Sequence, residues 1–281
     1  MEQRLENFEM SIARQVGLAK LQPLASASQI VSVYCGRICC DTEEGKINLQ
    51  SITLEGSLAT SKGARVKVDI SSCTSFRLFP GQIVAIIGTN PSGFCIVAKE
   101  ILSSFAPDDK QNTDTESMNM VVACGPFTAA ENLYYEPLQE LMEYCIRTKP
   151  DSLLLIGPFV DAEHPQIKQG MTEVGYDDLF HDSILAKLAD FHDRQGVKII
   201  LMPSVRDVQH EMVIPQTPIK VPDAMTIESL QNPCTFRYKG SVFGCSSIDW
   251  LMSSTREEIS KSADPVDRLP TLSLHLLNQK R

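Results

Sequence analysis

The pattern of apolar and polar positions changes along the chain, and its first change separates a helix from a set of strands. Near the N-terminus, apolar side chains recur every three or four residues, which predicts an amphipathic helix over residues 3–19. We assign residues 1–29 to this helix and a linker. From residue 30 to residue 102 the pattern has the two-residue period of strands, most clearly in residues 64–70.

Short apolar segments within residues 30–102 predict a small closed barrel. Turns rich in Gly, Pro, Asn and Ser separate the segments, which are residues 30–34, 47–54, 64–70, 83–88 and 94–98. Five strands in about 70 residues are typical of the oligonucleotide-binding (OB) barrel. We therefore predict an OB-fold domain over residues 30–102.

A different pattern follows residue 118 and predicts a layered α/β domain. Apolar runs at residues 118–123, 152–156 and 197–202 predict buried strands, and the segments between them have helical spacing. Strands that alternate with helices over short connections indicate a parallel or mixed sheet. Residues 234–245 predict a hairpin that leads into a helical end.

These patterns divide the chain into segments of different charge. We assign residues 119–281 to the α/β domain, and residues 103–118, which contain almost nothing apolar, to an acidic linker or loop. The whole chain of 281 residues has a net charge of −9, yet residues 30–102 carry seven Lys or Arg and six Asp or Glu. The acidic excess therefore lies outside the predicted barrel.

Composition limits the class of protein. Hydrophobic residues make up 43% and charged residues 22%, as in globular proteins, and no apolar run approaches the roughly 20 residues that span a bilayer. The polar, acidic start does not resemble a secretory signal. Nine cysteines without a C-x-x-C pair favour reduced structural thiols. We predict a soluble, intracellular protein with no membrane partner.

The carboxyl ends of the predicted strands carry distinctive sequences, and ligands of layered α/β folds bind beyond such ends. Together with three further segments, they resemble the B (regulatory) subunits of DNA polymerase alpha, in order from about residue 30 to residue 260. The segments are residues 78–82 (LFPGQ), 122–128 (VACGPFT), 135–138 (YEPL), 157–164 (GPFVDAEH), 203–211 (PSVRDVQHE) and 243–247 (FGCSS).

The resemblance implies an OB domain joined to a calcineurin-like phosphoesterase domain that has lost its active site. An active enzyme of that class carries Asp-x-His after the first strand, Gly-Asp-x-x-Asp after the second and Gly-Asn-His-Asp/Glu after the third. These side chains hold two metal ions, which activate water and bind the phosphate.

Few of those ligands are present in this chain. Phe127 and its neighbours offer none, and Pro158 stands in place of the bridging aspartate. Arg206 replaces the histidine of the third motif. Asp161 matches the last aspartate of the second motif, and Asp207 matches the acidic residue that ends the third. Two scattered aspartates do not hold a binuclear site. We therefore predict no catalytic, cofactor-binding or metal-binding residue, and no cofactor.

The resemblance also implies a role. The expected protein is a non-catalytic regulatory subunit of the DNA polymerase alpha–primase complex in the nucleus. It binds the C-terminal domain of the catalytic subunit, meets the primase subunits through the complex, and contacts DNA mainly through these partners. The resemblance further implies that an N-terminal helical domain and the last strands of the sheet lie outside the chain, so we expect the isolated chain to be poorly stable.

The sequence also leaves rival functions open. OB proteins bind single strands with a basic groove and aromatic side chains, but residues 47–54 and 64–70 contain no aromatic residue, and acidic residues balance the basic ones nearby. Docking of a protein is therefore preferred over stand-alone binding of single-stranded DNA. An active metallophosphoesterase and the equivalent B subunit of DNA polymerase delta or epsilon are two further rivals.

Overall fold

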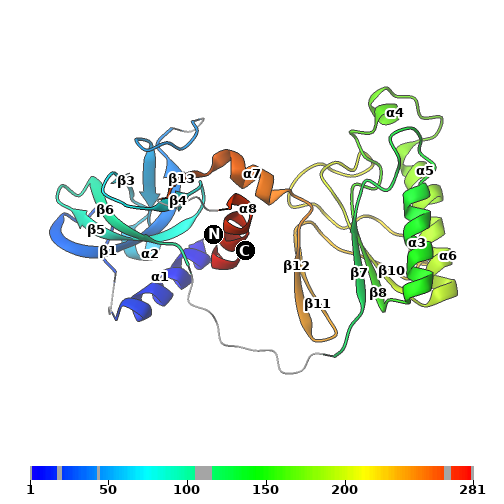
Figure 1. Cartoon of the computed structure of the whole chain (residues 1–281), viewed down its shortest axis with the longest axis horizontal. Helices are drawn as coiled ribbons and strands as arrows, with labels where there is room; N and C mark the ends of the chain where they lie inside the picture. Colours follow the sequence, from blue (N-terminus) through cyan, green and yellow to red (C-terminus); the bar gives the residue numbers. More distant parts are fainter. Residues whose placement is uncertain (1, 18–20, 43–44, 105–115, 263–266, 280–281) are drawn as a thin grey trace. The chain divides into compact units, whose positions relative to one another are not determined.

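The chain divides into two compact units. The computed structural model describes residues 2–17, 21–42, 45–104, 116–262 and 267–279. One unit, here called the barrel unit, comprises Met1–Asp109 and Asp249–Arg281, and the other, the sheet unit, comprises Lys110–Ile248 (Figure 1). Most of the predicted linker, residues 105–115, lies outside the described residues.

Five strands of the barrel unit close into a barrel, in the order β1-β2-β3-β6-β5. They are β1 (Ser28–Cys40), β2 (Ile52–Glu55), β3 (Arg65–Asp69), β5 (Ile83–Asn90) and β6 (Cys95–Leu102). Neighbours are antiparallel except β3 and β6, which are parallel. With 13 residues, β1 is long enough to pair with β2 at one end and with β5 along most of its length. The predicted OB barrel is confirmed.

The two-residue period of the sequence fills the barrel. In β3, Val66 and Val68 are buried, while the alternating charged residues Arg65, Lys67 and Asp69 are exposed. The two valines join a core that includes Tyr34, Leu54 and Ile86. Alternation therefore places one face of each strand inside the barrel and leaves the other face in water.

The second strand is shorter than predicted, because residues 47–51 form a turn. The side-chain oxygen of Asn48 accepts hydrogen bonds from the backbone N–H groups of Gln50 (2.9 Å) and Ser51 (3.0 Å). Because these N–H groups donate within the turn, they are not available for hydrogen bonds to a neighbouring strand. Strand β2 therefore begins only at Ile52.

Helices from both ends of the chain and several short elements complete the barrel unit. The N-terminal helix is confirmed as α1 (Glu2–Val16), which packs Leu5, Phe8 and Ile12 against β1 and β5. The remaining elements are α2 (Leu58–Ser61), β4 (Phe76–Leu78), α7 (Trp250–Glu257), β13 (Ile259–Lys261) and α8 (Arg268–Gln279).

Residues 249–279 pack on the barrel, whereas the sequence pattern placed residues 119–281 together in the second domain. Strand β13 pairs antiparallel with β4. Glu258 contacts Arg77 of β4 (3.5 Å) and His275 of α8 (2.9 Å), and its side chain is almost fully buried. The pairing of β13 with β4 and the Glu258–Arg77 contact join segments about 180 residues apart in sequence, which local periodicity does not predict.

The sheet unit is built on a four-stranded parallel sheet in the order β10-β9-β8-β7. Helices cover one face, and the predicted hairpin, β11 with β12, lies against the other (Figure 1). The elements are β7 (Met120–Cys124), α3 (Glu136–Thr148), β8 (Ser152–Ile156), α4 (Pro165–Lys168), α5 (Tyr176–Phe180), the π-helical turn η1 (His181–Leu185), α6 (Ala186–Gln195), β9 (Lys198–Met202), β10 (Ile227–Ser229), β11 (Cys234–Tyr238) and β12 (Ser241–Cys245).

Burial on both faces explains why the central strands have continuous apolar sequences. Leu153 and Leu155 of β8 face the helices, while Leu154 and Ile156 face the hairpin. The predicted α/β domain with a parallel sheet is thus confirmed. Within the described ranges, no helix has both the length and the apolar character that crossing a bilayer requires.

Candidate functional site

The candidate site lies where β7, β8 and β9 end and their loops meet. Glycine opens the first two of these loops, at Gly125 and Gly157. A Cβ atom added at Gly125 would lie 2.0 Å from the carbonyl oxygen of Pro158, and one at Gly157 would lie 2.2 Å from Oδ2 of Asp207. Only glycine lets the neighbouring loop approach this closely. The loops therefore pack directly on one another.

Asp207, in the loop after β9, is fully buried and serves as an acceptor for backbone donors. Its Oδ1 accepts hydrogen bonds from the N–H groups of Phe159 and Val160, the latter at 3.2 Å, and its Oδ2 accepts from the N–H of Ser204 at 2.7 Å. Burial raises the pKa of this carboxyl, and the backbone hydrogen bonds lower the pKa in part. Asp207 thus holds the β8 and β9 loops together.

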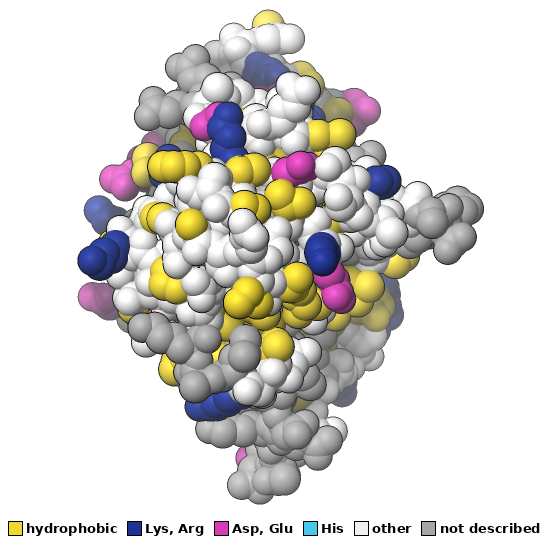
Figure 2. Space-filling view, turned by 90° about the vertical axis from the view of Figure 1, so that its left-hand side faces the viewer, with side chains coloured by type: hydrophobic (Ala, Val, Ile, Leu, Met, Phe, Trp, Pro, Cys, Tyr) yellow, Lys and Arg dark blue, Asp and Glu magenta, His cyan; other side chains and the backbone are white. Residues whose placement is uncertain are grey.

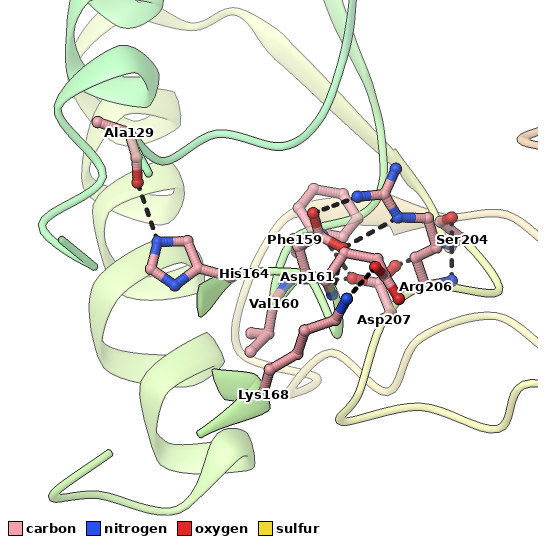
Figure 3. A network of polar contacts seen from close by, with 10 residues as sticks. Ala129, Phe159, Val160, Asp161, His164, Lys168, Ser204, Arg206 and Asp207 are labelled. Carbon is pink, nitrogen blue, oxygen red and sulfur yellow. Dashed lines mark hydrogen bonds and ion pairs between the residues drawn. The ribbon is translucent and has the colours of Figure 1, made fainter. Parts of the chain in front are cut away.

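Asp161 and Arg206 form an ion pair between the same two loops (Figure 3). The Nε atom of Arg206 donates to Oδ1 of Asp161 at 3.0 Å, and its Nη2 donates to Oδ2. The Asp161 side chain is 6% exposed, whereas that of Arg206 is 47% exposed. Backbone hydrogen bonds run beside the pair, from Ala162 N to Arg206 O and from Val208 N to Val160 O. Both carboxylate oxygens of Asp161 are therefore occupied by one guanidinium.

His164 has both ring nitrogens engaged in hydrogen bonds. Its Nε2 lies 2.9 Å from the carbonyl oxygen of Ala129 (Figure 3). Its Nδ1 accepts a hydrogen bond from the N–H of Gln166 at the start of α4. Its ring is thus fixed between the β7 loop and α4, and it acts as the N-cap of α4. Close to it, Lys168 pairs with Glu163 on the surface.

An aromatic cluster in the hydrophobic core adjoins the loops of the site. The rings of Phe127 and Phe159 stack with centroids 5.6 Å apart, and Phe180 meets Phe159 edge-on at the same distance. The hydroxyl of Tyr135 donates to the carbonyl oxygen of Phe159 at 3.0 Å, and burial raises the pKa of that hydroxyl. The first strand end therefore contributes apolar packing and no charged side chain.

The arrangement does not fit the two metal ions that a phosphoesterase fold implies. A binuclear site needs several carboxylate or imidazole ligands around a common centre, but Asp161 is bound by Arg206 and Asp207 by backbone N–H groups. A guanidinium beside the remaining carboxylates also repels a dication. Among the residues that the structure describes, no group of three His, Cys, Asp or Glu side chains is arranged to hold a metal.

The structure corrects one part of the sequence interpretation and adds to another. Asp161 and Asp207 are not scattered, because their backbones form an isolated antiparallel bridge. No sequence pattern indicated that Arg206 would pair with Asp161 or that His164 would reach Ala129. The Gly-Pro-Phe motif shared by two strand ends was the available signal for close loop packing. His210 lies elsewhere in its loop, where its Nε2 bonds to the carbonyl of Thr217 at 2.7 Å.

Family models match both parts of the chain. The model for the OB domain of the DNA polymerase alpha B subunit matches residues 1–104, and the model for the DNA polymerase alpha/epsilon B subunit matches residues 120–281. Together the two matches cover nearly the whole chain and follow the same order as the barrel and the sheet.

Curated relatives give the same result. The DNA polymerase alpha B subunit of Bos taurus is 32% identical over 286 residues, covering 99% of this chain and 47% of the relative. The Schizosaccharomyces pombe protein of that name is 28% identical over 306 residues, covering 100% of this chain and 52% of the relative. That of Saccharomyces cerevisiae is 27% identical over 317 residues, covering 100% of this chain and 44% of the relative. The chain spans about half the length of these relatives, and it belongs to the family of DNA polymerase alpha B subunits.

Proposed function

We propose that this chain is a non-catalytic docking subunit of the DNA polymerase alpha–primase complex and acts in the nucleus. In this proposal it binds the C-terminal domain of the catalytic subunit, and the primase subunits join through the complex. Membership of the family supports this role. The equivalent subunit of DNA polymerase delta or epsilon is less well supported, because the OB-domain match and the relatives named above are all of the alpha type.

The observation that carries the non-catalytic part is the Arg206–Asp161 ion pair. A hydrolase would need the carboxylate of Asp161 free to bind a cation, and Arg206 supplies a fixed positive charge in place of that cation. Breaking the pair would leave a nearly buried carboxylate without its partner, which is costly. The energetics of the loops therefore favour a structural role for both residues.

Both units also carry exposed apolar side chains of the kind that docking surfaces use. Ile30 and Phe94 of the barrel unit are 77% and 81% exposed, and Val213, in the loop after β9 of the sheet unit, is 67% exposed. Protein interfaces bury apolar and aromatic anchors of this kind within a polar rim. This exposure supports docking of a protein, and it is independent of the candidate metal site.

Direct binding of single-stranded DNA is the weaker alternative. Arg37 and Arg65 of the barrel share the carboxylate of Glu55, at 2.9 and 3.0 Å, and Lys67 pairs with Asp41 at 3.0 Å. On the face that Figure 2 shows, Lys and Arg side chains are scattered among apolar and acidic ones and form no continuous stripe. Neutralised charges release few counterions on binding a phosphate backbone. We therefore propose that DNA is contacted mainly by the partners.

Co-purification tests the docking role. The full chain is co-expressed with the C-terminal domain of a DNA polymerase alpha catalytic subunit, and the expected result is a stable one-to-one complex on size exclusion. A chain that elutes alone at micromolar concentration, and that instead binds oligo(dT) with a steep salt dependence, would overturn the proposal in favour of a DNA-binding OB protein.

An assay of phosphodiester hydrolysis tests the non-catalytic part. The wild type, Asp161→Asn and the matched control Glu163→Gln are incubated with Mn²⁺ and an activated phosphodiester. Glu163 is a suitable control because it is an exposed carboxylate of the same loop. We expect no turnover above the metal-only background for any of the three. Turnover by the wild type that Asp161→Asn abolishes and Glu163→Gln retains would contradict the proposal.

A further inference from the structure

Two cysteines face each other across the hairpin of the sheet unit. Cys234 of β11 is directly opposite Cys245 of β12, and both are partly buried and unoxidised. Directly opposite residues of antiparallel strands have Cα atoms about 4.5–5.5 Å apart. This spacing lies within the roughly 4.4–6.8 Å that a disulfide requires.

The surroundings of the pair are rich in sulfur. The Sγ atom of Cys234 lies 3.8 Å from Sδ of Met202 on β9. Cys124, at the exposed end of β7, is close enough to Cys245 to influence its ionisation. The adjacent cysteines of β1, Cys39 and Cys40, lack this geometry, because successive side chains of a strand point to opposite faces. The hairpin pair is therefore distinguished by its register.

We propose that Cys234 and Cys245 form a reversible redox site, at which a small-molecule disulfide such as oxidised glutathione introduces an intramolecular disulfide across the hairpin. The site is separate from the loops of Asp161 and Asp207, and it does not depend on the proposed function.

The reaction proceeds by two thiol–disulfide exchanges. The Cys245 thiolate attacks oxidised glutathione, whose S–S bond breaks as a mixed disulfide forms and one glutathione leaves. The Cys234 thiolate then attacks the Cys245 sulfur of that mixed disulfide, and the second glutathione leaves. The two cysteine sulfurs lose two electrons, the glutathione disulfide gains them, and the two cysteine protons end on the two glutathione thiols.

The Cys234 thiol donates its hydrogen to Sδ of Met202, so we assign Cys245 as the attacking residue. Burial raises the pKa of both thiols, that of Cys234 to about 11. Because the thiolate is the reactive form, oxidation is slow near neutral pH and accelerates as the pH rises.

The disulfide would reinforce a link that the hairpin already has. Just beyond the paired strands, Asn232 Nδ2 donates to Oγ of Ser247 (2.7 Å), and the N–H of Ser247 donates to Oδ1 of Asn232 (3.1 Å). These bonds hold the two ends of the hairpin together without a covalent link. Oxidation would make that closure covalent and would suppress opening of β11 from β12.

The test uses the full chain, fully reduced and then incubated with oxidised glutathione at about pH 7 and about pH 9. Remaining thiols are alkylated, and the peptides are mapped by mass spectrometry. We expect a single disulfide, Cys234–Cys245, that forms faster at the higher pH and that dithiothreitol reverses. Amide exchange in β11 and β12 should slow about tenfold in the oxidised form.

Variants identify the order of attack. Cys234→Ser should stop the reaction at the mixed disulfide of Cys245, and Cys245→Ser should leave Cys234 largely reduced, whereas Cys145→Ser, at a buried thiol of α3, should oxidise like the wild type. Wild-type protein that remains fully alkylatable at Cys234 and Cys245, or that links Cys245 to Cys124 instead, would overturn the proposal. Peptide mapping of the wild type decides this even if a variant fails to fold.

Discussion

Two buried carboxylates, those of Asp207 and Glu9, differ in how many of their oxygen atoms accept hydrogen bonds. Asp207 has backbone N–H donors on both oxygens. Glu9 of α1 accepts hydrogen bonds from the hydroxyls of Ser57 (3.0 Å) and Thr60 (2.8 Å) through Oε2, but its buried Oε1 has no hydrogen-bond partner among the described residues. Burial raises the pKa of both groups. Because Asp207 has donors on both oxygens and Glu9 on only one, we expect their neutral analogues to change stability in opposite directions.

Substitution Asp207→Asn should destabilise the sheet unit. An amide keeps one acceptor but turns an N–H₂ group toward either the Ser204 N–H or the Phe159 N–H, so a buried donor loses its partner. The expected loss is about 1–3 kcal/mol in the free energy of unfolding. It is measured by urea denaturation followed by far-UV circular dichroism, with Glu163→Gln as the exposed control. An unchanged midpoint would show that the carboxylate does not join the loops.

Substitution Glu9→Gln should instead stabilise the barrel unit near neutral pH. The folded-state pKa of Glu9 is raised above its ordinary value of 4.5, so the folded chain binds this proton more tightly than the unfolded chain. Its contribution is fully present below pH 4.5 and is lost as the pH rises through the folded-state pKa. The advantage of the glutamine variant should therefore be largest at neutral pH and vanish toward pH 4.5.

The only tryptophan, Trp250, provides the measurement for Glu9→Gln, because it lies in the barrel unit with its ring 5.8 Å from that of Phe79. Urea unfolding followed by its fluorescence at several pH values gives the comparison. A variant that is less stable than the wild type at neutral pH would contradict the assignment of Glu9 as a carboxylate that burial destabilises.

At the scale of elements, the apolar pattern predicted the main helices and strands, whereas contacts with other segments and local side-chain hydrogen bonds determined the short ones. Helix α1 and strand β3 follow from the period of their apolar positions, and strands β7, β8 and β9 follow from their continuous apolar runs. Strands β4, β10 and β13 have three residues each and exist only through their neighbours. Residues 47–51 have strand-like apolar positions, but the side chain of Asn48 closes a turn there instead. Side-chain hydrogen bonding thus overrides periodicity where a segment is short.

Helix α8 is held to the barrel by a side chain that acts like backbone. The buried Gln279 accepts a hydrogen bond from the N–H of Ile83 (2.8 Å) and donates to its carbonyl (2.9 Å), and it also donates to the carbonyl of Ser103 (2.8 Å). This amide thus satisfies both polar groups of Ile83, at the start of β5, much as a neighbouring strand would.

Substitution Gln279→Ala should therefore loosen α8 from the barrel and lower the free energy of unfolding of this unit by about 1–3 kcal/mol. Trp250 fluorescence during urea unfolding measures the change, and amide exchange at Ile83 should quicken. The control is Leu277→Ala, at a neighbouring side chain that is 72% exposed. Equal effects of the two variants would show that Gln279 contributes no more than a surface residue.

For the whole molecule, sequence patterns were sufficient for the architecture but not for the assignment of segments to units. The barrel and the parallel sheet were both predicted, because each is built from elements that follow one another in sequence. Residues 249–279 join the barrel through β13–β4 pairing and the contacts of Glu258, which no local pattern reveals. The sequence identified the strand ends and the side chains there that cannot bind metal, whereas the Arg206–Asp161 ion pair depended on the relative placement of two loops.

The return of residues 249–279 to the barrel means that the barrel unit is completed only at the end of synthesis. A ribosome releases the five barrel strands first, at roughly 5–20 residues per second. The polar groups of Ile83 find Gln279 only after the entire sheet unit has been translated. The nascent barrel therefore lacks these partners for Ile83 until residues 249–279 have been synthesised.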